Sequence, residues 1–141
     1  MRDLMNSIAP KRAISPAVAV ADNTPIVSQI IDVLGFGSLT FLILTGALAD
    51  ADATFTVLVE HGDAANLSDA AAVSDADLLG TEALASFTFA DDDKVFKIGY
   101  VGIKRYVRLT VTPAGNSGNA FVSAVALLGH PAMFPTANPP V

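Results

Sequence analysis

The 141-residue sequence predicts an all-β protein: a single β-sandwich or jelly-roll-like domain with an extended arm at each end. Short apolar segments alternate with turn-forming residues, several segments have the period of two that places alternate side chains on opposite sheet faces, and no long amphipathic helix is evident. Hydrophobic residues make up 52% of the chain and charged residues 16%. This composition favours a substantial core, and we expect part of the apolar surplus to be buried between subunits.

Proline sets the limits of the predicted domain. Residues 1–25 contain Pro10, Pro16 and Pro25, which prevent a long helix or a central strand, so we expect an extended N-terminal arm. Residues 131–141 hold four of the eight prolines and are predicted to form a second, proline-rich arm. The β-sandwich domain is therefore expected over residues 26–130.

The first half of this domain contains three predicted strands. Residues 28–33 and 38–45 are separated by Gly-Phe-Gly, and the second segment is apolar on both faces, which favours a central position in a sheet. Residues 53–61 alternate apolar and polar side chains and predict a half-buried strand. Residues 62–82 are rich in alanine, aspartate and serine, and we expect a long loop with at most a short strand or helical turn.

The second half contains four more predicted strands. Residues 84–90 and 95–101 flank three consecutive aspartates and predict a hairpin. In residues 104–112, Val107, Leu109 and Val111 form a core face, while tyrosine, arginine and threonine form the other. A turn-rich segment then leads to an apolar strand over residues 120–129. Gly99 and Gly102 are expected to mark a bend or bulge before the charged strand.

No pattern in the chain predicts catalysis, a cofactor or a metal site. His61 and His130 have no carboxylate or serine at a known motif spacing, and Ser117 lies in a turn between strands. Acidic pairs or runs at Asp50 and Asp52, Asp75 and Asp77, and residues 91–93 supply too few ligands for calcium, and we interpret them as solvated loop charge. We therefore expect a protein that is not an enzyme.

Charge is divided unevenly along the chain. Residues 48–93 carry eleven acids and no lysine or arginine, whereas residues 94–141 carry five bases and no acid. Two interpretations remain open: the charges pair within one molecule, or they form complementary patches between subunits. The net charge of −6 argues against nucleic-acid binding. The longest apolar run, residues 39–49, is short for a membrane helix, so no membrane association is expected.

The segment YVGIKRYVRLTVTPAGNSGNAFVSAVALLGHP, residues 100–131, together with MRDL at residues 1–4 and LLGTE at residues 78–82, resembles small structural proteins of tailed bacteriophages that are encoded beside the major capsid protein. The resemblance implies a virion component, namely a head decoration (cement) protein on the outer capsid surface that binds the major capsid protein and stabilises the head. A head-completion or tail role is an alternative. No catalytic residue is implied. The lack of cysteine and of a signal peptide fits assembly in the host cytoplasm.

We expect the protein to act through contact surfaces, with the major capsid protein and as a homo-oligomer such as a trimer. The candidate interface residues are mostly basic and lie in the N-terminal arm and the charged strand: Arg2, Lys11, Arg12, Lys104, Arg105, Tyr106 and Arg108. A carbohydrate-binding jelly-roll module on the virion surface is the alternative from another class. Aromatic residues suited to stacking on sugar rings are scarce, because tryptophan is absent and the tyrosines are Tyr100 and Tyr106.

Overall fold

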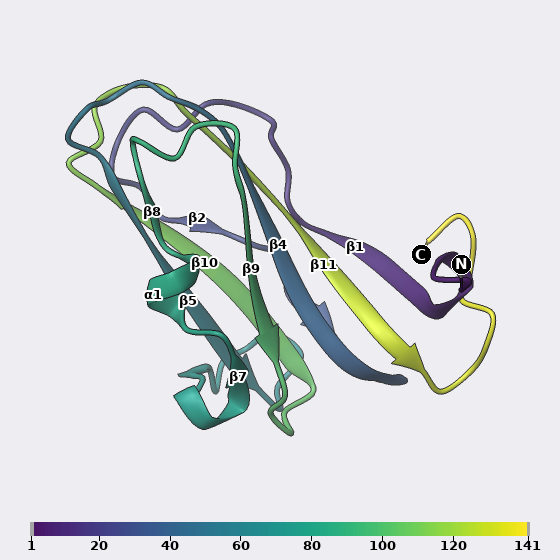
Figure 1. Ribbon diagram of the computed structural model, residues 1–141. Helices are drawn as coiled ribbons and strands as arrows, with labels where there is room; N and C mark the ends of the chain where they lie inside the picture. Colours follow the sequence, from purple (N-terminus) through teal and green to yellow (C-terminus); the bar gives the residue numbers. More distant parts are fainter. Residues whose placement is uncertain (1, 141) are drawn as a thin grey trace.

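In the computed structural model, which describes residues 2–140, two antiparallel sheets pack face to face as a β-sandwich (Figure 1). This confirms the predicted fold class. Sheet A has the strand order β1-β11-β4-β9-β7, and sheet B has the order β2-β10-β5-β6, with β3 also pairing with β10 and β8 with β5. The strands are β1 (Ile8–Ile14), β2 (Ile26–Val27), β3 (Ile31–Asp32), β4 (Phe36–Leu48), β5 (Thr54–Gly62), β6 (Ala71–Ala72), β7 (Leu78–Leu79), β8 (Phe87–Thr88), β9 (Val95–Tyr100), β10 (Tyr106–Ala114) and β11 (Ala120–Pro131). The short helices are η1 (Met5–Ser7), η2 (Asp75–Asp77) and α1 (Glu82–Ala85).

The core lies between the inner faces of the two sheets. On β10 the predicted core residues Val107, Leu109 and Val111 are fully buried. The long strand β4 lies between β11 and β9, as its apolar character predicted, and its inward side chains meet those of sheet B. Stacked phenylalanine rings also connect the sheets, because Phe87 lies 4.9 Å from Phe55 of β5 and 5.3 Å from Phe96 of β9 between ring centroids.

The segment predicted as one strand over residues 28–33 is interrupted. Strands β2 and β3 both pair with β10, and Ser28 lies between them. The Ser28 backbone N–H donates to the Leu109 carbonyl at 2.8 Å, and the Leu109 N–H donates to the Ser28 hydroxyl at 2.9 Å. A side-chain oxygen thus accepts a bond that a backbone carbonyl accepts in a regular ladder, so the chain stays attached to β10 through the irregularity.

The predicted hairpin over residues 84–101 is wrong. Strand β8 pairs with β5 in sheet B, whereas β9 pairs with β4 and β7 in sheet A. The aspartates between them carry the chain from one sheet to the other, and Asp91 and Asp92 accept backbone N–H bonds from Thr88 and Leu48. The turn after β10 also joins the two sheets, because β11 lies in sheet A. Local turn signals therefore gave the positions of the turns but not the pairing partners.

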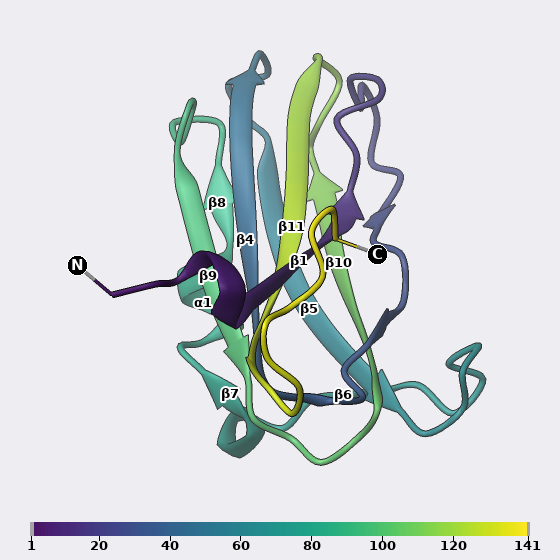
Figure 2. The same ribbon diagram turned by 90° about the vertical axis from the view of Figure 1, so that its right-hand side faces the viewer.

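Both predicted arms fold against sheet A (Figure 2). Within residues 1–25, β1 pairs with β11 from Ile8 opposite Gly129 onward, so this part of the arm is an edge strand of the sandwich. An edge position tolerates Pro10, which has no N–H to donate. The proline-rich segment then returns beside β1, where Thr136 donates from its N–H to the Asn6 carbonyl at 2.9 Å and from its hydroxyl to the Ile8 carbonyl at 2.6 Å. Residues 1 and 141, at the outer limits of the two predicted arms, lie outside the described residues.

Candidate interaction surfaces

The positive charge of strand β10 is paired with a carboxylate of the same molecule. Arg108 faces Glu60 across the β10–β5 ladder, and its Nη2 lies 2.8 Å from the Glu60 Oε2. Both side chains are largely buried, at 28% and 19% exposure. The pair lies on the outer face of sheet B and aligns two strands, as expected for opposite charges directly across a sheet.

The two basic residues before β10 also have intramolecular partners. Arg105 binds Asp32 of β3 with two parallel bonds, Nε to Oδ1 at 2.9 Å and Nη2 to Oδ2 at 2.8 Å. These bonds hold the pKa of the Asp32 carboxyl below its usual value. The Arg105 guanidinium also lies 5.0 Å from the centre of the Tyr106 ring. Lys104 pairs with Asp63, which raises the pKa of the lysine.

A buried tyrosine explains the glycines that precede this strand. The Tyr100 hydroxyl lies 3.0 Å from the His61 Nδ1, accepts the Lys104 N–H at 2.9 Å and lies 3.2 Å from the Lys104 carbonyl. A Cβ at Gly102 would lie 2.6 Å from this hydroxyl, so a side chain there would displace the ring. Gly99 faces the Leu79 Cβ at a similarly close distance, 3.0 Å. Both glycines thus permit close packing where the chain leaves β9.

Three of the candidate basic residues lie instead near the N-terminus: Lys11 and Arg12 belong to the edge strand β1, and Arg2 precedes η1. Among residues 2–140, Arg2, Lys11 and Arg12 take part in none of the ion pairs. Arg12 donates only to neutral oxygens, those of Ser15 at 3.0 Å and Gln29 at 2.9 Å. Within the described chain, the basic residues outside the ion pairs are therefore Lys11 and Arg12 on β1, Arg2 before η1, and the exposed Lys97 on β9.

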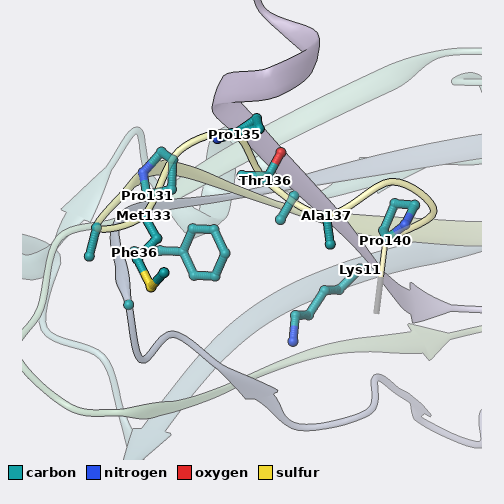
Figure 3. A pocket seen from close by; sticks show the side chains of 11 residues that line it. Lys11, Phe36, Pro131, Met133, Pro135, Thr136, Ala137 and Pro140 are labelled. Atoms are coloured by element: carbon teal, nitrogen blue, oxygen red, sulfur yellow. The ribbon is translucent and has the colours of Figure 1, made fainter.

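An apolar groove opens beside this edge, where the C-terminal segment crosses β1. One part, of about 340 Å³, is lined by Phe36, Met133, several prolines and the stem of Lys11 (Figure 3). A second part, of about 370 Å³, adjoins it and shares Ala137 and Pro140. We call the two parts together the terminal groove. Large apolar side chains near it are exposed: Leu4, Met5, Met133 and Phe134.

The outer face of sheet A is also apolar. Cross-strand neighbours place Leu42 beside Val125, Thr40 beside Leu127, and Leu44 beside Val95. These side chains point away from the core, because the intervening residues of β4 are the buried ones. Within the described part of the chain, the charged residues that the pairing places on this face are Arg12 and Lys97. We call this surface the apolar face.

The outer face of sheet B has a different character. Its paired positions include Thr112 with Thr56 and Ala114 with Thr54, in addition to the ion pair of Arg108 and Glu60. Such a surface is readily hydrated. The difference is visible in the sequence, because β4 carries large apolar residues on both of its faces, whereas β10 alternates between apolar and polar or charged residues. A strand that is apolar on both sides needs a covered outer face.

Asp50, Asp91 and Asp92 of the acidic runs accept hydrogen bonds from backbone N–H groups. Asp50 accepts from both the N–H and the hydroxyl of Ser117, at 2.7 and 2.6 Å, and these bonds lower its pKa. Over residues 2–140, no group of three or more histidine, cysteine, aspartate or glutamate side chains is arranged to hold a metal ion. None of the helices in the same range is long and apolar enough to cross a membrane.

Comparison with known proteins yields similarity of fold alone. No family model and no curated protein sequence matches the chain. The phage-derived PBSX exported protein XepA has a similar fold, at 14% identity and a TM-score of 0.53. The alignment covers 98% of this chain and 42% of the XepA chain. The infectious bursal disease virus VP2 subviral particle is similar at 12% identity and a TM-score of 0.51, and the alignment covers 91% of this chain and 33% of the VP2 chain.

A module-containing enzyme has a similar fold as well. The Clostridium thermocellum xylanase 10B, solved as its CBM22-1 and GH10 modules with xylohexaose, matches 95% of this chain and 28% of its own, at 11% identity and a TM-score of 0.50. The chain thus spans less than half the length of each of these three structures. At these identities the similarity establishes the β-sandwich and leaves the function to the surfaces.

Proposed function

We propose that the protein is a structural component of a tailed-phage virion, a capsid decoration protein that binds the major capsid protein through the apolar face. In this proposal it has no catalytic role and lies on the outer capsid surface. The observation that carries the proposal is the apolar face itself: the outer side of sheet A presents leucines and valines, whereas the outer side of sheet B presents mainly threonines and an ion pair, with Leu58 and Val27 beside Thr110.

Such a face is suited to binding a large, flat protein surface. Removing apolar area from water contributes about 25 cal/mol per Å², and a standard interface covers roughly 800 Å² on each partner. On a capsid, many copies of the protein meet a repeating lattice, so a modest contact in each copy suffices for stable coverage. The rigid sheet also loses little conformational entropy on binding.

The sequence resemblance and the fold support the same assignment. The resemblance over residues 100–131 implies a virion protein, and that segment includes β10 and β11, of which β11 contributes Val125 and Leu127 to the apolar face. The fold also occurs in XepA and in the VP2 subviral particle. These similarities support a virion role at the level of the fold, and the finer assignment to the head surface rests on the apolar face.

Mass spectrometry of purified virions, with heads and tails separated, tests the location. We expect the chain in the head fraction, in many copies. Its absence from virions, or its presence in tails alone, would overturn the assignment.

A binding assay on heads that lack the protein tests the surface. We expect Leu44→Lys, a change at the exposed part of the apolar face, to reduce occupancy at least tenfold, because it places a charge in the contact. The matched control is Thr112→Lys, which adds the same side chain to the exposed outer face of sheet B. Equal occupancy of the two variants would show that the apolar face is not the docking surface.

A further inference from the structure

We infer that two copies of this chain associate head to tail, with the terminal groove of one copy receiving the opposite edge of sheet A of the next. This inference does not rest on the proposed function, because it concerns the two edges of sheet A, although Arg12 borders both the β1 edge and the apolar face. The two edges concerned are β1 and β7, the first and last strands in the order of sheet A. Figure 1 shows the termini beside β1 on one side of the molecule and β7 with α1 on the other.

The β7 edge is acidic and has protruding apolar side chains. We define it as residues 74–86, which contain Asp75, Asp77 and Glu82 and no lysine or arginine. None of these acids takes part in an ion pair among residues 2–140. Beside them Leu79 is 63% exposed and Leu84 is 74% exposed. Leucines this exposed, bordered by carboxylates, are typical of a surface that a partner covers.

The β1 edge has the complementary properties. It carries Lys11 and Arg12, which take part in no ion pair within residues 2–140, and the terminal groove beside them is apolar and concave (Figure 3). Leucine side chains from the β7 edge would enter the groove against Phe36 and Met133, while carboxylates would meet Lys11 at the rim. Both the apolar and the charged parts of one edge therefore find their counterparts on the other.

This arrangement identifies which charges act between molecules. The cations of residues 104–108 are paired within the chain, which leaves Lys11 and Arg12 at the β1 edge, Asp75 and Asp77 at the β7 edge, and Lys97 of β9 on the outer face of the sheet. A symmetric dimer that joined two β1 edges, or two β7 edges, would bring like charges together. A head-to-tail contact brings opposite charges together, and it generates a ring if the rotation closes and a chain of subunits if it does not.

Mixing two variants tests the inference. Lys11→Glu reverses the charge at the terminal groove, and Asp75→Lys reverses an exposed charge at the β7 edge whose side chain makes no hydrogen bond within the described chain. Sedimentation or light scattering should give assemblies of at least two copies for the wild-type protein and monomers for each variant alone. The mixture of the two variants should give dimers, because each variant retains the edge that the other has lost.

Each result decides the question. A monomeric wild-type protein at high concentration, single variants that still assemble, or a mixture that remains monomeric would overturn the head-to-tail arrangement. Thr112→Lys on the outer face of sheet B is the control and should assemble as the wild type does. Met133→Ser and Leu84→Ser, at side chains that are 85% and 74% exposed, repeat the mixing test without charge reversal and without risk to the core.

Discussion

The Tyr100 hydroxyl offers a sharp test of how the two sheets are held together. Tyr100→Phe leaves the ring in place and removes only the oxygen that meets His61 of sheet B and the Lys104 backbone. The Tyr100 side chain is buried, at 4% exposure, so water replaces the lost partners poorly. A neutral hydrogen bond contributes about 1 kcal/mol, and a buried donor left without a partner costs about 1–3 kcal/mol.

We therefore expect Tyr100→Phe to lower the free energy of unfolding by about 2 kcal/mol. For a chain of this length, an unfolding entropy of about 2 cal/mol/K per residue converts the loss into a fall of roughly 7 °C in the melting temperature. Urea unfolding and calorimetry measure the two quantities. The matched control is Tyr106→Phe, because the Tyr106 hydroxyl has no hydrogen-bond partner within residues 2–140 and its removal should change stability by less than about 0.5 kcal/mol.

A loss below about 0.5 kcal/mol for Tyr100→Phe would refute this reasoning. It would mean that water satisfies His61 and the Lys104 N–H in the variant, and that the hydroxyl does not join the sheets.

Three further predictions concern the core and the ion pairs. Leu109→Ala should lower the free energy of unfolding by about 2–5 kcal/mol, measured by urea unfolding, because the side chain is fully buried; a loss below 1 kcal/mol would contradict the packing. A double-mutant cycle on Arg108→Ala and Glu60→Ala should give a coupling of about 1 kcal/mol, and additive effects would show that the pair is not formed. Because the pKa of Asp32 is lower in the folded state than in the unfolded state, its pairing with Arg105 stabilises the protein fully above about pH 5 and progressively less as the pH falls through about 4. The stability difference between wild type and Asp32→Asn should accordingly shrink between pH 7 and pH 3, and a constant difference would contradict this linkage.

The sequence predicted the strands much better than their partners. Alternation along β10 identified its buried face, and the apolar character of β4 placed it centrally, because both properties depend on burial of individual positions. The hairpin prediction failed because the aspartate turn after β8 looks the same locally whether it joins neighbouring strands or opposite sheets. Only the packing of Phe87 against Phe55 and Phe96 separates these alternatives.

The candidate surfaces, too, could be predicted from the sequence only in part. Composition along the chain showed an excess of positive charge in residues 94–108, but not that Arg105 and Arg108 would find Asp32 and Glu60. Those contacts depend on strand register, which the sequence does not display. The basic residues near β1 were identified as candidates, yet the groove beside them arises only when the C-terminal segment crosses that strand.

The pairing of β1 with β11 also has a consequence for the timing of synthesis. Ile8 pairs with Gly129, so sheet A stays incomplete on the ribosome until residues close to the C-terminal segment have emerged. Until then the edge of β4 that pairs with β11 has no partner, and the nascent chain exposes strand edges prone to aggregation. Closing a contact between such distant positions is slow, so we expect the pairing of β1 with β11 to be a late step in folding.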